Sequence, residues 1–191
     1  MKNESAKVNN APPPIPGNMS YIITKKSRLD VSFSDFLWCI KARSKDITRP
    51  NITGILIEPA KICATDGCRI HIITNPYPSI PPGEYEVYQV NQSKVILISK
   101  STTTKDSSFP VWNRTTITMK GKKPEHNIVI DHHGCFYAEI LKRRIVDIKL
   151  LQDAISNEPM NVKIYGEMQP VIITTLTRTA IVMPLLDRKV S

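Results

Sequence analysis

Residues 64–73 read Ala64-Thr65-Asp66-Gly67-Cys68-Arg69-Ile70-His71-Ile72-Ile73, which sets an Asp-Gly pair between two short runs of sheet-forming residues. Asp-Gly favours the tight two-residue turn of a β-hairpin, because that turn needs a positive φ that Gly adopts freely and Asp tolerates. The stretch therefore predicts strands at residues 61–65 and 68–74. Asp66 and His71 also resemble an acid–base pair, but an Asp at a hairpin corner is far more often a turn residue.

Length and composition predict a single globular domain with a basic surface. The 191 residues are 41% hydrophobic and 23% charged, and 26 Lys and Arg against 17 Asp and Glu give a net charge of +9. This charge favours polyanionic partners, nucleic acid first, although an inert basic surface fits it equally well. No stretch approaches the ~18 apolar residues of a membrane helix, and the N-terminal residues lack the apolar core of a secretory signal. We therefore expect a cytoplasmic protein that does not bind membranes.

Enzymatic motifs are weak in this sequence. Only seven glycines occur and none form a nucleotide-binding loop, so we expect no nucleotide cofactor. The four cysteines are too widely spaced for a disulfide framework or a paired zinc motif, and we expect reduced thiols. One alternative is a metal site built from His132, His133 and Cys135 together with Cys63 or Cys68. We expect neither a metal nor a catalytic residue, and a metal-dependent enzyme remains the third hypothesis.

The first half of the folded region reads as a β-α-β-β-β unit. A strand is expected at residues 20–26, and Ser32 or Ser34 is placed to cap a following helix. The apolar residues of that helix recur with helical spacing, which predicts one buried face. They are Phe33, Phe36, Leu37 and Ile40. Strands at residues 52–58, 61–65 and 68–74 complete the unit.

The second half repeats the same order of elements. A hairpin is expected at residues 127–131 and 135–141, then a helix at 143–156, then three strands. These strands are expected at residues 161–166, 170–176 and 180–186. The repeated order predicts an internally duplicated α+β domain. The expected helix starts with positive charges that oppose its dipole, which suggests another purpose for those charges.

The remaining segments are two tails and an insertion. Residues 1–18 are rich in proline and are expected to form a disordered tail, and residues 187–191 form a second tail. The domain is expected at residues 19–186. Residues 76–118 interrupt it with a hairpin at 84–100 and a Ser/Thr/Lys-rich loop.

Basic side chains accompany both expected helices, away from their apolar stripes. Lys and Arg presented by rigid elements can contact DNA phosphates without reading the sequence of the bases. The candidates for non-specific DNA binding are Lys41, Arg43, Lys45, Lys142, Arg143, Arg144 and Lys149.

Four segments of the chain form an ordered series. They are Ala64-Thr65-Asp66-Gly67-Cys68-Arg69-Ile70, Phe109-Pro110-Val111-Trp112-Asn113-Arg114, Met168-Gln169-Pro170-Val171 and Val182-Met183-Pro184-Leu185. The series resembles the bacterial DNA polymerase III β subunit, the sliding clamp. That family carries Ala-Thr-Asp-Gly-His-Arg-Leu, Phe-Pro-Asp-Tyr-Arg-Arg and Val-Met-Pro-Met in the matching places. Cys68 stands where the family has His, and Ile70 where it has Leu.

The resemblance implies a DNA-clamp domain of two β-α-β-β-β units, with helices on one face of antiparallel sheets and lining a hole of DNA size. It also implies a groove that binds peptide motifs of replication and DNA-processing proteins. The residues that match this groove are Thr65, Gly67, Cys68, Arg69, Ile70, Pro110, Met168, Pro170, Ile181, Met183 and Pro184.

The chain departs from the family in length. The family carries three such domains per chain, whereas this chain has length for one, so a closed ring needs about six copies in a head-to-tail homo-oligomer. In the family, the Thr-Asp-Gly strand and the Met-Pro strand of one groove belong to neighbouring domains. Two functions follow as hypotheses: a clamp-like protein that binds duplex DNA and tethers partners, or a clamp-fold interaction module or inhibitor, of phage or plasmid type, that binds a host protein without encircling DNA.

Overall fold

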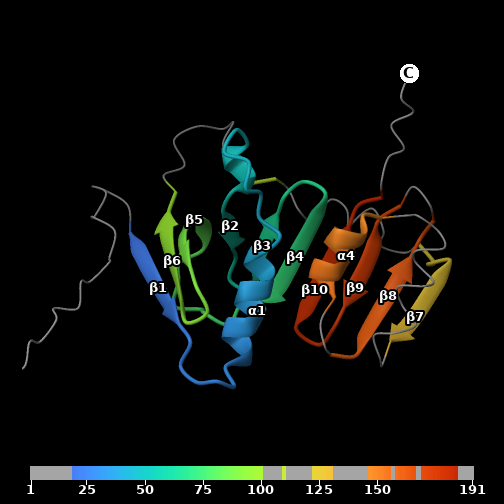
Figure 1. The fold of residues 1–191 in the computed structure, drawn as a ribbon, viewed down its shortest axis with the longest axis horizontal. Helices are drawn as coiled ribbons and strands as arrows, with labels where there is room; N and C mark the ends of the chain where they lie inside the picture. Colours follow the sequence, from blue (N-terminus) through green and yellow to red (C-terminus); the bar gives the residue numbers. More distant parts are fainter. Residues whose placement is uncertain are drawn as a thin grey trace, which may run out of the picture.

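Ten strands form one antiparallel sheet in the part of the chain that the computed structural model describes, which is residues 19–100, 109–110, 122–130, 146–155, 158–166 and 169–184. The spatial order is β1-β6-β5-β2-β3-β4-β10-β9-β8-β7 (Figure 1). The strands are β1 (Ser20–Thr24), β2 (Ile55–Ile57), β3 (Lys61–Thr65), β4 (Arg69–Thr74), β5 (Gly83–Val90), β6 (Lys94–Ser99), β7 (His126–Ile130), β8 (Met160–Ile164), β9 (Val171–Thr174) and β10 (Arg178–Val182).

Two helices pack against the same face of this sheet. Helix α1 (Val31–Ile40) lies over β3 and β4, and α4 (Ile148–Ala154) lies over β10 (Figure 1). The elements β1-α1-β2-β3-β4 and β7-α4-β8-β9-β10 follow the same β-α-β-β-β order, which confirms the duplicated α+β architecture. We call the side of the sheet that carries the helices the helical face and the opposite side the outer face.

Apolar residues alternate between the two faces, as the period of a β-strand requires. In β4, Ile73 and His71 point to the helical face, whereas Ile70 and Ile72 point to the outer face. The helical face holds the larger core, which joins α1 and α4 to the sheet. The outer face holds a smaller buried cluster of Cys63, Ile70, Ile72, Phe109, Ile172 and Ile181.

The expected hairpin within the insertion is confirmed. Strands β5 and β6 pair across a turn in which the Asn91 side-chain oxygen accepts hydrogen bonds from the backbone N–H groups of Ser93 (2.9 Å) and Lys94 (2.7 Å). The hairpin lies between β1 and β2 in the sheet, so it separates the first strand of the unit from the other three.

Aspartates cap both α1 and α4, although the sequence suggested a serine cap for α1. Asp30, rather than Ser32 or Ser34, caps α1 because its carboxylate accepts a hydrogen bond from the Phe33 N–H at 3.0 Å. Asp147 caps α4, which therefore begins at Ile148 and not at residue 143. The predicted conflict between basic residues and the α4 dipole was wrong, because an acidic side chain occupies the N-cap.

Strand β2 is shorter than predicted. The structure forms a 3-10 helix, η1 (Pro50–Ile52), where the sequence pattern suggested the start of the strand. Pro50 favours this turn because it fixes φ and lacks an N–H. The expected strand at 135–141 and the two tails lie outside the described residues. Among the helices of the described residues, none has the length and apolarity needed to span a membrane.

The Asp30 cap is directly testable. Asp30→Ala should lower the free energy of unfolding by about 1 kcal/mol, because the Phe33 N–H loses its acceptor. Asp30→Asn is the matched control, since the Asn side-chain oxygen can accept the same bond and should retain most of the stability. Urea unfolding followed by circular dichroism measures both; equal losses in the two variants would contradict the cap.

Candidate functional site

The corner between β3 and β4 is wider than the predicted two-residue turn. Thr65 pairs with Ile70, which leaves four residues between them. The Asp66 carboxylate accepts hydrogen bonds from the backbone N–H groups of Cys68 (2.9 Å) and Arg69 (3.0 Å), and the Thr65 hydroxyl accepts one from Gly67 N–H (3.0 Å). Only Gly67 needs a positive φ, of 91°. Asp66 is thus a turn residue that organises this corner.

The antiparallel pairing of β4 with β10 joins the two halves of the chain. Ile70 lies opposite Ile181, and Arg69 lies opposite Val182. One residue further, the Met183 N–H donates a hydrogen bond of 2.8 Å to the Cys68 carbonyl. The Thr-Asp-Gly strand and the Met-Pro strand therefore meet within a single chain.

Most residues predicted for peptide binding lie at this junction, on or beside the outer face. Ile70 and Ile181 are buried in the outer-face cluster, and Met183 remains 39% exposed above it. Cys68 and Gly67 are exposed at the corner, and Pro184 is half-buried. The remaining predicted residues differ in placement: Pro170 is buried, Pro110 is exposed, and Met168 lies outside the described residues.

Phe109 was not singled out for the site, yet it closes part of the outer-face cluster. Its ring is 8% exposed and packs with Cys63, Ile70 and Ile181. Its N–H donates a 2.6 Å hydrogen bond to the Glu84 carboxylate of β5. The Phe-Pro segment is thereby held beside the β4–β10 junction.

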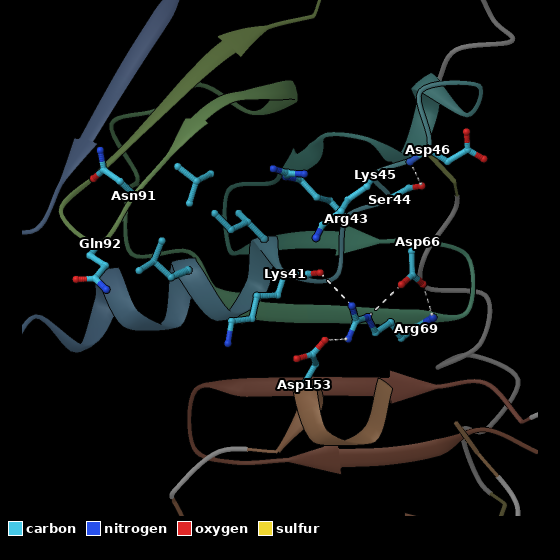
Figure 2. A pocket seen from close by; sticks show the side chains of 13 residues that line it. Lys41, Arg43, Ser44, Lys45, Asp46, Asp66, Arg69, Asn91, Gln92 and Asp153 are labelled. Atoms are coloured by element: carbon cyan, nitrogen blue, oxygen red, sulfur yellow. Dashed lines mark hydrogen bonds and ion pairs between the residues drawn. The ribbon is translucent and has the colours of Figure 1, made fainter. Parts of the chain in front are cut away.

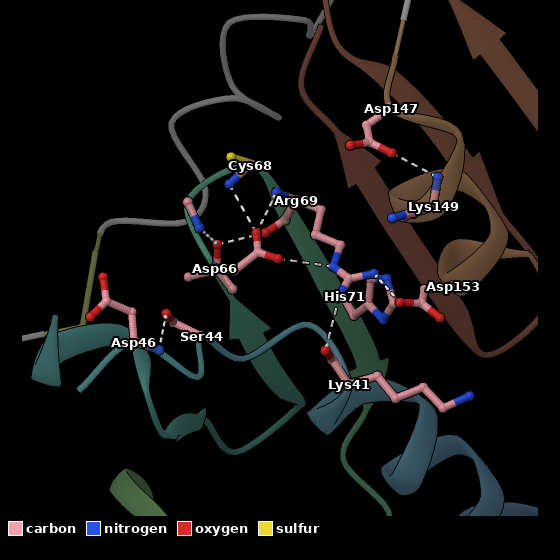
Figure 3. A network of polar contacts seen from close by, with 12 residues as sticks. Lys41, Ser44, Asp46, Asp66, Cys68, Arg69, His71, Asp147, Lys149 and Asp153 are labelled. Carbon is pink, nitrogen blue, oxygen red and sulfur yellow. Dashed lines mark hydrogen bonds and ion pairs between the residues drawn. The ribbon is translucent and has the colours of Figure 1, made fainter. Parts of the chain in front are cut away.

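Arg69 was predicted to contact a peptide, but its side chain points to the helical face. The guanidinium pairs with Asp66 at 3.1 Å and with Asp153 of α4 at 2.7 Å, and it donates to the Lys41 carbonyl at 3.1 Å (Figure 3). Arg69 is 8% exposed. On the helical face, Arg69 therefore connects three elements: the β3–β4 corner, the C-terminal end of α1, and α4.

A second arginine, which is partly buried, connects the halves in the reverse direction. Arg178 of β10 pairs with Asp35 of α1 at 2.6 Å, and the Thr177 hydroxyl donates to the same carboxylate at 2.8 Å. The guanidinium also lies 5.4 Å from the centre of the Trp38 ring. Sequence patterns did not reveal Asp153 or Arg178 as contacts, because their partners are 84 and 143 residues away.

His71 is a buried structural residue and does not pair with Asp66. Its ring stacks on Trp38 with centres 4.1 Å apart, and its Nδ1 lies 3.0 Å from the Trp38 carbonyl oxygen. Burial lowers the pKa of His71 to about 4. The imidazole is therefore neutral near pH 7, and the preferred interpretation of Asp66 as a turn residue, rather than as half of an acid–base pair, is confirmed.

The basic residues proposed for DNA binding divide into two groups. Lys41, Lys45 and Lys149 are exposed, at the end of α1 and on α4. Arg43 is half-buried, and burial lowers the pKa of its guanidinium. Lys142, Arg143 and Arg144 lie outside the described residues.

The cysteines offer no assembled metal site in the described residues. Burial raises the pKa of Cys63 to about 12 and the pKa of Cys39 well above its usual value. Cys68 is exposed at the corner. No three His, Cys, Asp or Glu side chains within the described part of the chain are grouped to hold a metal.

The fold is that of the bacterial DNA polymerase III β subunit. The β subunit of Thermotoga maritima superimposes with a TM-score of 0.58 at 12% identity, covering 95% of this chain and 69% of that one. The Caulobacter crescentus β sliding clamp gives a TM-score of 0.56 at 11% identity, covering 95% and 69%. The Helicobacter pylori β clamp, solved with a DNA ligase peptide, gives 0.52 at 10% identity, covering 92% and 67%.

These likenesses establish the clamp fold, which the sequence resemblance had predicted. No protein-family model and no curated protein matches the sequence. The chain spans about two thirds of the length of the clamps it matches.

The Arg178–Asp35 ion pair predicts strong coupling between the halves. Arg178→Ala should lower the free energy of unfolding by about 3 kcal/mol, because Asp35 stays buried without its partner. Removing both partners should cost less than the sum of the single changes, as expected for interacting groups. Arg28→Ala, at an exposed position, is the control and should change stability by less than ~0.5 kcal/mol. Additive losses in urea unfolding would contradict the pair.

The buried His71 predicts an acid-sensitive fold. Its folded pKa lies below its ordinary value of 6.5, so the unfolded chain binds more protons between pH 6.5 and about 4. Stability should fall as the pH falls through this window, by at most ~1.4 kcal/mol per pH unit from this group. His71→Phe keeps an aromatic stack on Trp38 and should flatten the dependence of the unfolding free energy on pH. An unchanged slope in that variant would refute the assignment.

Proposed function

We propose that this protein is a clamp-fold binding protein that docks short peptide motifs of DNA-processing proteins on its outer face, at the β4–β10 junction. The observation that carries the proposal is the pairing of Ile70 with Ile181 in one chain, with the partly exposed Met183 next to them. The proposed activity is binding rather than catalysis.

The junction has the properties of a peptide-docking surface. A rigid apolar floor with a flexible methionine at its edge can accept a hydrophobic anchor residue, and polar groups at the rim fix its orientation. Cys68 and Gly67 form that rim on the corner. The structurally similar H. pylori clamp was solved with a DNA ligase peptide, which supports the same kind of ligand here.

A second candidate function is non-specific binding of duplex DNA at the helical face. Exposed Lys41, Lys45 and Lys149 favour it, because they lie at one end of α1 and on α4, which cover the same side of the sheet. In this proposal a homo-oligomeric ring surrounds the DNA and tethers replication partners. Peptide docking does not require that ring, so an interaction module that leaves DNA unbound is the alternative.

Peptide docking can be tested with Met183→Glu. The added carboxylate should disfavour an apolar anchor and reduce the affinity for the DNA ligase peptide at least tenfold, about 1.4 kcal/mol. Met19→Glu is the matched control, since Met19 is exposed beside β1 and far along the sheet from the junction. Fluorescence anisotropy of the labelled peptide reports the affinity. Absence of binding to the wild type, or equal binding to both variants, would contradict the proposal.

DNA binding can be tested with a Lys41/Lys45/Lys149→Ala triple variant. Loss of phosphate contacts should weaken binding to all duplex sequences alike and make the salt dependence shallower by about 2 to 3 in log K against log salt. The control removes three exposed lysines outside the helices, Lys26, Lys122 and Lys123. If both variants lose the same affinity, the helical face is not the DNA site.

A further inference from the structure

A pocket of about 900 Å³ opens on the helical face beside the C-terminal end of α1 (Figure 2). Its apolar lining is aliphatic and consists of Leu37, Ile40 and Val90. This volume is within the ~300–1,000 Å³ range of ligand sites in proteins. The pocket is separate from the outer-face junction, because the sheet lies between them.

The turn of the inserted hairpin forms one wall of the pocket. Val90, Asn91 and Gln92 come from this turn, and Val90 is 41% exposed. The Asn91 side chain holds the turn closed, as described above, so the wall has a defined shape. Gln92 is exposed and carries both a donor and an acceptor that suit a peptide backbone.

The charged side chains that line the pocket differ in the ion pairs and hydrogen bonds that they form. Two of its carboxylates, Asp66 and Asp153, are engaged by Arg69. The third, Asp46, accepts hydrogen bonds from the Thr48 N–H (2.9 Å) and hydroxyl (2.7 Å). The cations Lys41, Arg43 and Lys45 also line the pocket. With Arg69 included, four cations and three carboxylates line the described part of the pocket, so its net charge is +1.

Arg43 is the lining residue that best suits a hydrogen-bond acceptor of a ligand. Its Nε is buried and has no hydrogen-bond partner, although the side chain as a whole is half-buried. A buried donor without an acceptor is unfavourable, and a carboxylate can satisfy a guanidinium through two parallel hydrogen bonds. Arg43 also has no carboxylate partner among the described residues, so its guanidinium can pair with an anionic ligand in the pocket.

We propose that this pocket binds an acidic peptide segment, with an aliphatic side chain on Leu37, Ile40 and Val90 and a carboxylate at Arg43. None of the described residues that line the pocket is aromatic, so these residues do not supply the stacking surface that nucleic-acid bases use. The aliphatic lining and the positive charge together favour a peptide over a nucleic acid. The site is a second docking position, independent of the proposed outer-face function.

The proposal is tested by selecting random twelve-residue peptides against the full chain, after removing peptides that also bind a Val90→Asp variant. The selected peptides should combine Asp or Glu with a neighbouring Leu, Ile or Val. Calorimetry should then show at least a tenfold loss of affinity for Val90→Asp and for Arg43→Gln. Leu29→Asp, at an 88% exposed position outside the pocket, is the matched control and should bind as the wild type does.

The outcomes separate this site from the outer-face site. Met183→Glu should leave the selected peptides bound, and loss of their binding in that variant would assign them to the outer face and overturn the proposal. Selected peptides that are neutral or basic, or no selected peptides, would also overturn it. A third outcome would assign the pocket to nucleic acid instead. In that outcome, no selected peptide depends on Val90, and Val90→Asp lowers the affinity for duplex DNA tenfold.

Discussion

The pairing of β4 with β10 is the contact on which the rest of the structure depends. It is the only place in the ordered sheet of the described residues where a strand of the first half pairs with a strand of the second. Arg69 and Arg178 reinforce it from the helical face, each reaching from one half to a carboxylate on a helix of the other. The two ion pairs run in opposite directions and favour one register of the halves, because a slip of one residue would leave the buried Arg69 and Asp35 without these partners.

This junction gives the two faces different chemistry. The outer face presents apolar residues from β4 and β10 beside Phe109, whereas the helical face presents lysines and a pocket with a partly unsatisfied arginine. Alternation along a strand explains the division, since neighbouring residues such as Arg69 and Ile70 point to opposite sides. A ligand on one face can therefore bind without displacing a ligand on the other.

Local sequence signals predicted the elements well and their long-range contacts poorly. The position of the Asp-Gly corner, the β5–β6 hairpin and the repeated order of elements were correct, because turn chemistry and periodicity are local, but the predicted two-residue length of the corner was not. Motif matching does not record which face a strand residue occupies, so it gave no sign that the Arg69 side chain points to the helical face. The Asp153 and Asp35 ion pairs were missed because no local pattern links residues so distant in sequence. The predicted start of α4 was too early, because the prediction included the basic residues before Asp147 in the helix and did not recognise Asp147 as its N-cap.

The central claim is that one chain supplies both walls of the peptide site. Sedimentation equilibrium of the protein with a labelled DNA ligase peptide, at protein concentrations where the 21.6 kDa single chain predominates, tests it most directly. The account predicts one peptide bound per single chain at saturation. Peptide bound only to species that contain two or more chains would contradict it, because the site would then form between copies and not within the β4–β10 junction.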